Sequence, residues 1–142
     1  MTMTERWPDL AGRIVDGVHS LPVRVYYEDT DRGGVVYHAN YLKYCERGRS
    51  DWLRLLGVHQ DQLPDLLFVV RRMTCDFVKS ARLDDLLEVE TRFLERGGAR
   101  LELEQRVQKA GETIFQAKVT AALIDGRGRP RRLPPELEKL LP

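Results

Sequence analysis

The chain has 142 residues, of which 42% are hydrophobic and 32% are charged. This length and composition predict one globular domain with a core of its own. The net charge of +1 gives no general attraction for nucleic acid or a membrane surface, and no run approaches the ~20 apolar residues that a membrane span needs.

The cysteines and the N-terminal residues indicate the cellular compartment. Cys45 and Cys75 are too few and too far apart for a disulfide framework or a zinc knuckle, which favours a reducing compartment. Residues 1–20 contain no continuous apolar run, so they do not resemble a secretory signal. We therefore expect a cytoplasmic protein without a bound metal.

The first predicted elements are an arm, a strand and a long helix. Residues 1–20 have weak periodicity and are expected to form an N-terminal arm, whereas residues 21–27 alternate as a half-buried strand does. Residues 39–56 place apolar side chains at helical spacing, and Gly57 is a suitable helix stop. Gly48 lies within the apolar stripe at a cost of about 1 kcal/mol relative to alanine, which suggests that another backbone approaches closely there.

The second half of the chain has the pattern of a sheet. A β-rich segment at 68–79 and alternating segments at 86–94, 101–107 and 115–123, the last three separated by glycine turns, predict four more strands. The domain is thus expected to span residues 21–125, followed by a tail at 126–142 with a short helix near its end. The order predicts an α+β fold in which an antiparallel meander wraps around one long central helix, and exposed edge strands that favour a homo-oligomer.

The segment between the first strand and the helix has the composition of a site. Glu28, Asp29 and Asp31 precede the pair Gly33-Gly34. Taken alone, such aspartates are more often turn formers than catalysts. However, the first turn of the following helix offers free N–H groups that can polarise a carbonyl oxygen. A carboxylate opposite them could attack that carbonyl or activate water, so the segment predicts acyl transfer to water.

The run Tyr27 to Tyr41, YEDTDRGGVVYHANY, resembles the signature of hotdog-fold acyl-CoA thioesterases of the 4-hydroxybenzoyl-CoA thioesterase class. Within that class it is most similar to the Tol–Pal-associated branch, and the similarity continues through Gly57 and the later strands. The resemblance implies a hotdog fold, hydrolysis of an acyl-CoA, no cofactor beyond the CoA of the substrate, and an active site at the interface of a homodimer or homotetramer. The branch also suggests an envelope complex or an acyl-carrier protein as a partner.

The same resemblance implies roles for individual residues. Asp31 would be the catalytic carboxylate, as nucleophile or general base, and the backbone N–H of His38 would polarise the thioester carbonyl. The substrate pocket would be formed by Gly33, Gly34, Val36, Tyr37 and Asn40. The CoA phosphates would meet Arg96 and Arg100, with Lys79 and Arg82 behind them. Arg32 stands where the family usually has a small residue or proline, so we expect it to alter the charge of the site and its choice of acyl group.

The sequence suggests four other interpretations. The same pocket could belong to a non-catalytic acyl-CoA or acyl-carrier binding module, or to a hotdog dehydratase, which would need the imidazole of His38. A calcium loop is excluded because Gly33 occupies the third ligand position and Asn40 stands in place of the bidentate glutamate. The arginine-rich residues 127–133 are interpreted as a solvated tail rather than a nucleic-acid site.

Overall fold

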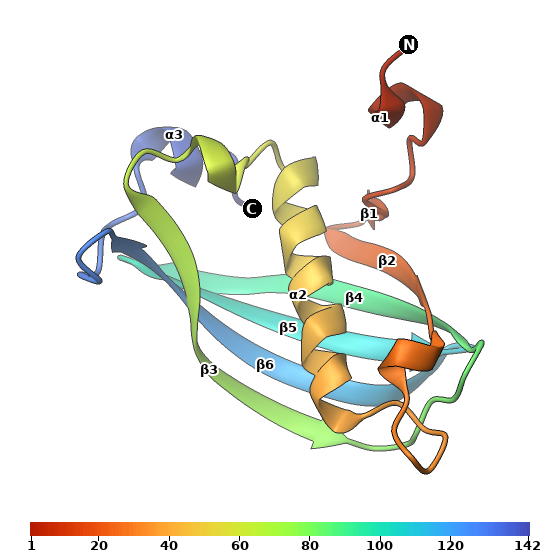
Figure 1. Ribbon diagram of the computed structural model, residues 1–142. Helices are drawn as coiled ribbons and strands as arrows, with labels where there is room; N and C mark the ends of the chain where they lie inside the picture. The colour runs from red at the N-terminus through yellow and green to blue at the C-terminus, as the bar shows by residue number, and fades with distance from the viewer.

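A six-stranded antiparallel sheet curves around one long helix in the computed structural model, which describes residues 1–142 (Figure 1). The strands lie in the order β1-β2-β4-β5-β6-β3. Their bounds are β1 Arg13–Val15, β2 Val18–Arg24, β3 Leu66–Phe77, β4 Leu86–Gly97, β5 Arg100–Lys109 and β6 Glu112–Asp125. The predicted α+β hotdog architecture, a sheet wrapped around a long central helix, is confirmed.

Helix α2 (His38–Leu55) agrees with the prediction to within one residue at each end. Its sequence contains no β-branched residue, which favours the helix, and Gly57 ends it with a φ of +89°. The N–H of Gly57 donates to the carbonyl of Arg54, and the N–H of Val58 donates to that of Leu53. This pair of bonds satisfies the last carbonyls of the helix and turns the chain away from it.

The close approach predicted at Gly48 exists, but side chains make it rather than another backbone. A Cβ atom on Gly48 would lie 2.9 Å from Cγ1 of Val89 and 3.2 Å from both Nε2 of Gln105 and Oγ1 of Thr91. Gln105 is fully buried, and its Nε2 donates to the carbonyl of Cys45 and to Thr91. Because these polar groups need direct access to the helix, the sheet packs against it where the helix has no side chain.

The prediction of a four-stranded meander was wrong in one respect. β4, β5 and β6 do form a meander, but β3 pairs with β6 and not with β4. β2 occupies the other side of β4, so the free edge of β6 is the place left for β3. β3 is twelve residues long. It consequently lies at the edge of the sheet (Figure 1).

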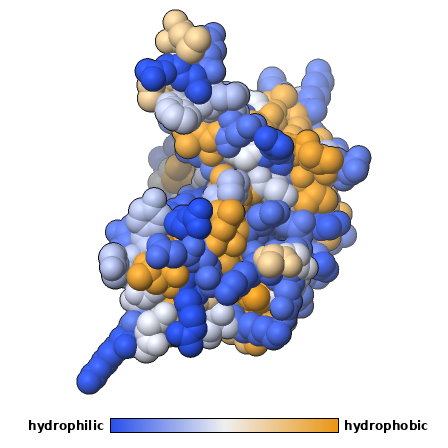
Figure 2. Space-filling model, turned by 90° about the vertical axis from the view of Figure 1, so that its right-hand side faces the viewer, coloured by the Kyte–Doolittle hydropathy of each residue, from blue (hydrophilic) through white to orange (hydrophobic).

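Both ends of the chain differ from the expected arm and tail. Residues 13–15 and 18–20, expected in the arm, are strands that pair as a hairpin, because β2 begins at Val18 and β1 pairs with it. The remaining arm, with α1 (Met3–Arg6), stands out from the body in Figure 2, where hydrophobic residues form separate patches among hydrophilic ones. At the other end, α3 is a single turn, Pro135–Glu138, although the tail buries Leu133, Leu137 and Leu141.

No helix of the protein is both long enough and apolar enough to cross a membrane.

Candidate active site

The loop that joins β2 to α2 is organised by Asp29. The chain leaves the sheet after Arg24 and enters a 3-10 turn, Tyr27–Asp29, so the strand predicted to reach residue 27 ends earlier and Tyr27 is 83% exposed. The carboxylate of Asp29 is buried and accepts a hydrogen bond from the N–H of Tyr26 at 2.8 Å. This local bond favours a turn over an extended strand.

The main chain of Asp29 also fixes the start of the helix. Its carbonyl accepts hydrogen bonds from the N–H of Tyr37 at 2.9 Å and from Nδ2 of Asn40 at 2.8 Å. Glu28, by contrast, is exposed. The three carboxylates therefore do not share one site: Asp29 holds the loop against the helix, and Asp31 remains at the surface.

Asp31 lies in a tight turn two residues further on. Its N–H donates to the carbonyl of Val35 at 2.8 Å, and its carbonyl accepts from the N–H of Gly34 at 3.0 Å. Gly34 has a φ of +79°, which a residue with a side chain adopts only with strain. Oδ1 of Asp31 accepts from the N–H of Gly33 at 2.8 Å, whereas Oδ2 has no partner within the chain. The carboxylate is thus fixed through one oxygen and presents the other to an incoming group.

The first turn of α2 begins three residues after this turn and offers free donors. Neither His38 nor Ala39 donates its backbone N–H to another group of the chain, because a helix leaves its first N–H groups without intrahelical partners. The positive end of the helix dipole lies at the same place. The imidazole of His38 is occupied by aromatic contacts, with ring centroids 4.5 Å from Tyr37 and 6.1 Å from Phe77.

The predicted pocket residues all lie on this loop or on the first helical turn. Val36 and Asn40 are buried, and the N–H of Val36 donates to the carbonyl of Ala81 at 2.8 Å. Tyr37 is the residue before the helix and is exposed, but its side chain does not cap it. Gly33 and Gly34 are exposed beside Asp31. Arg32 is also exposed and forms no ion pair.

The four predicted CoA-binding side chains do not form one group. Arg82 lies beside the active-site loop, because its backbone bridges to Val35, and nearby Lys79 is paired with Glu112. Arg96 instead contacts Glu138 in the tail, and Arg100 pairs with Glu102. The two pairs lie near opposite ends of β4, roughly 35 Å apart for a strand of that length. The prediction placed Lys79 and Arg82 behind Arg96 and Arg100. Within one chain, the two pairs instead lie far apart.

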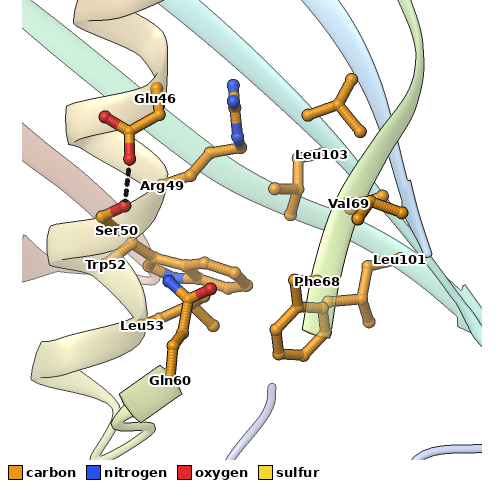
Figure 3. A pocket seen from close by; sticks show the side chains of 12 residues that line it. Glu46, Arg49, Ser50, Trp52, Leu53, Gln60, Phe68, Val69, Leu101 and Leu103 are labelled. Carbon is orange, nitrogen blue, oxygen red and sulfur yellow. Dashed lines mark hydrogen bonds between the residues drawn. The ribbon is translucent and has the colours of Figure 1, made fainter. Parts of the chain in front are cut away.

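A cavity of about 190 Å³ opens between α2, β3 and the middle of the sheet (Figure 3). Eight of its twelve lining residues are hydrophobic. Its polar lining consists of Glu46, Arg49, Ser50 and Gln60, and Figure 3 shows the carboxylate of Glu46 turned toward Ser50, whose hydroxyl donates to it at 2.7 Å. The sequence did not predict this cavity. The only sequence feature related to the cavity is the helical spacing of Glu46, Arg49, Ser50 and Leu53, which places them on one side of the helix. This spacing does not predict which strand lies opposite.

The family model described as the thioesterase superfamily matches residues 33–115 of the chain, from the glycine pair into the last strand. The acyl-CoA thioesterase YbgC of Haemophilus influenzae is 44% identical over 129 residues, covering 88% of this chain and 95% of that protein. The acyl-CoA thioester hydrolase YbgC of Escherichia coli O157:H7 is 44% identical over 117 residues, covering 80% and 87%. A probable thioesterase from Bartonella henselae has a solved structure that aligns with a TM-score of 0.80 at 44% identity, covering 82% of this chain and 99% of that one.

The chain therefore belongs to the thioesterase superfamily. The resemblance found in residues 27–41 and the predicted enzyme class, a thioester hydrolase, are both confirmed.

Proposed function

We propose that the protein hydrolyses an acyl-CoA to a free carboxylic acid and CoA. The names of the two similar YbgC proteins support this substrate class. The proposal rests on one observation: Asp31 presents an exposed carboxylate on a loop that Asp29 ties to the start of α2. The first N–H groups of that helix are unpaired. CoA enters as part of the substrate, and no other cofactor has a role.

In this mechanism the thioester carbonyl oxygen accepts a hydrogen bond from the N–H of His38. The bond and the helix dipole stabilise the negative charge that develops on that oxygen when the carbonyl carbon is attacked. Asp31 acts in one of two ways: as a general base that takes a proton from water, or as a nucleophile whose acyl anhydride water then hydrolyses. In both cases the C–S bond breaks, the CoA sulfur takes up a proton, and the water oxygen remains in the acid.

The decisive variant is Asp31→Asn. The side-chain oxygen of asparagine can still accept the hydrogen bond of the Gly33 N–H, so the turn should be retained while the negative charge is lost. We expect hydrolysis of acyl-CoA to fall to background with an unchanged thermal unfolding midpoint. Glu28→Gln, which removes an exposed carboxylate from the same loop, is the matched control. Comparable rates for Asp31→Asn and the wild type would contradict the mechanism, and acyl-CoA binding without turnover in the wild type would favour a binding module.

His38→Ala separates main-chain from side-chain chemistry. The substitution keeps the backbone N–H and removes only the imidazole, which packs on Tyr37 and Phe77. A thioesterase of the proposed kind should retain most of its kcat. A dehydratase that uses the imidazole would lose its activity, so the variant is assayed for both thioester hydrolysis and enoyl-CoA hydration.

For the CoA phosphates we propose Lys79 and Arg82, because they lie on the same side of the molecule as the active-site loop. Arg96 and Arg100 could contact the same ligand only from a second subunit. The CoA-phosphate role predicts that Arg82→Ala raises KM for an acyl-CoA and not for the corresponding acyl-pantetheine, which lacks the nucleotide. Equal changes in both KM values would contradict it.

We propose a homodimer or homotetramer in the cytoplasm. The twelve-residue edge strand β3 presents unpaired backbone groups together with exposed Leu67, Val70 and Phe77, which supports pairing with a second copy. The two unpaired cysteines support a reducing compartment. Sedimentation of the purified protein tests the oligomer. An envelope-complex or acyl-carrier partner remains a proposal that co-purification tests.

A further inference from the structure

The cavity of Figure 3 separates one side of α2 from β3 and the middle of the sheet. The helix packs mainly on β1, β2, β4 and β5, and the start of β3 faces it across the cavity. Trp52 and Leu53 of the helix, Phe68 of β3 and Leu103 of β5 make the walls apolar. The cavity therefore suits a hydrocarbon or aromatic group.

The same side of the helix leads back to the proposed oxyanion donor. Glu46, Arg49, Ser50 and Leu53 line the cavity at the spacing of one helical stripe. Ala39 and Leu42 continue that stripe to the first turn, where His38 lies. The rise from His38 to Arg49 is roughly 16 Å. An acyl group whose carbonyl sits at His38 would thus extend along the stripe toward Arg49.

Arg49 is the unusual group in this lining. It is half-buried, and its only hydrogen bond runs from Nη1 to Oε1 of Gln105 at 2.9 Å. It forms no ion pair, since Ser50 holds the nearby Glu46 carboxylate turned away from it. Burial lowers the pKa of Arg49, and the opposing influences of Cys45 and Glu46 do not offset that effect. A partly buried guanidinium without a carboxylate partner is costly, and its unused N–H groups favour an oxygen acceptor.

We propose that Arg49 is a specificity-determining residue that binds an oxygen acceptor, a hydroxyl or a carboxylate, at the end of the acyl group distal to the thioester. This inference rests on the proposed hydrolysis of acyl-CoA. It deepens that function by naming the substrate class: acyl-CoAs with an apolar middle and an oxygen at the far end.

The test compares three matched series of acyl-CoA that differ only at the terminal carbon, which bears hydrogen, a hydroxyl or a carboxylate. The chain lengths bracket the helical rise between His38 and Arg49. A hydrogen bond to a charged group discriminates by about tenfold or more, so the wild type should show at least that advantage in kcat/KM for one oxygenated series. Whichever oxygenated series is preferred identifies the terminal group. Equal kcat/KM values across the three series would overturn the proposal and leave the hydrolase assignment intact.

Substitution of Arg49 then assigns the preference. Arg49→Met keeps an apolar stem of similar length, and the ratio of oxygenated to plain kcat/KM should fall to about one. Arg54→Met, which removes an exposed arginine from the same helix, should leave the ratio as in the wild type. A merely structural role through Gln105 would lower all three series equally, and that result would overturn the proposal. If Arg49→Met does not fold, Arg49→Lys serves instead, with a reduced ratio expected for both oxygenated series.

A binding measurement keeps the inference testable even if no acyl-CoA is hydrolysed. Trp52 lines the cavity, and Trp7 is the only other tryptophan, so the Trp7→Phe protein reports on the cavity by fluorescence. Non-hydrolysable thioether analogues of the acyl-CoAs that end in a hydroxyl or a carboxylate should bind at least about tenfold more tightly than the analogue that ends in a methyl group, and Arg49→Met should abolish the difference. Equal affinities would overturn the role of Arg49, whereas loss of hydrolysis alone would contradict only the proposed function.

Discussion

The carbonyl of Asp29 accepts a hydrogen bond from Nδ2 of Asn40, 2.8 Å away and eleven residues later in the chain. Both residues are buried, and the bond joins the end of the 3-10 turn to the first turn of α2. Asp31 and the free N–H of His38 both lie between these two residues in the sequence. The distance between the carboxylate and the oxyanion donor is thus set by a bond in which neither takes part.

Asn40→Ala should therefore impair catalysis as well as stability. The substitution leaves the Asp29 carbonyl with the Tyr37 N–H as its one remaining donor and opens a small buried space, at a cost of about 1–3 kcal/mol in the free energy of unfolding. We expect kcat to fall more than KM rises, because the loop loses its alignment with the helix start. Urea unfolding and steady-state kinetics measure the two effects, with exposed Lys43→Ala as control. A destabilised variant with unchanged kcat would show that the bond does not align the site.

Gly48→Ala should destabilise the protein although alanine is the better helix former by about 1 kcal/mol. The new methyl group would lie 2.9 Å from Cγ1 of Val89, closer than packed carbon atoms come, and would press on the buried Gln105 amide. Overpacking of this kind costs about 1–3 kcal/mol. Val89→Ala makes room, so the double variant should be more stable than the sum of the single effects predicts. Additive free energies of unfolding would refute the steric account.

Local patterns were enough to predict the helix and most of the strands. Residues 39–56 carry a helical stripe with Gly57 at its end, and the last three strands alternate and have glycine turns between them. The roles given to Asp31 and His38 came from a long continuous motif, and the structure places both in one loop and helix start. These features depend on residues close together in sequence, where periodicity and turn chemistry act directly.

Features that depend on distant residues could not be predicted. The position of β3 beside β6 follows from which sheet edge stays free once β2 has paired with β4. The early end of β2 has a local cause that periodicity does not show: a single hydrogen bond from the Tyr26 N–H to the side chain of Asp29 competes with the extended strand. The cavity beside Arg49 exists because β3 lies away from the helix, and no pattern within 46–53 reveals that separation.

Asp125 should make the free energy of unfolding depend on pH in the acid range. Its carboxylate is nearly fully buried, accepts the backbone N–H groups of Arg129 and Arg127, and pairs with the side chains of Arg129 and Arg131. The N–H of Arg129 is the largest of the causes that lower the pKa of Asp125 to about 2, against the opposing effect of burial. The unfolded chain, with an ordinary pKa near 3.8, takes up its proton first as pH falls. The stabilisation is therefore present above pH 3.8 and lost as pH approaches 2.

The measurement is the free energy of unfolding of the wild type and Asp125→Asn as a function of pH. Asp125→Asn should be the less stable at neutral pH, and the difference should shrink between pH 3.8 and 2 as the wild-type carboxylate is protonated. Asp61→Asn, an exposed aspartate without hydrogen bonds in the chain, should show no such convergence. A difference that stays constant over this interval would mean that the carboxylate charge does not stabilise the loop after β6.

Cys45 should be unreactive in the folded protein. It is fully buried on the core face of α2, where burial raises the pKa of its thiol to about 12, so almost no thiolate exists at neutral pH. Cys75 is half-buried on the edge strand β3, and burial also raises the pKa of its thiol. An aromatic disulfide reagent should therefore titrate Cys75 slowly and Cys45 only after denaturation. The folded Cys75→Ser variant should then not react with the reagent. Rapid reaction of two thiols per chain in the native wild type would contradict the burial of Cys45. Such a reaction would also add a background to thiol assays of the CoA product.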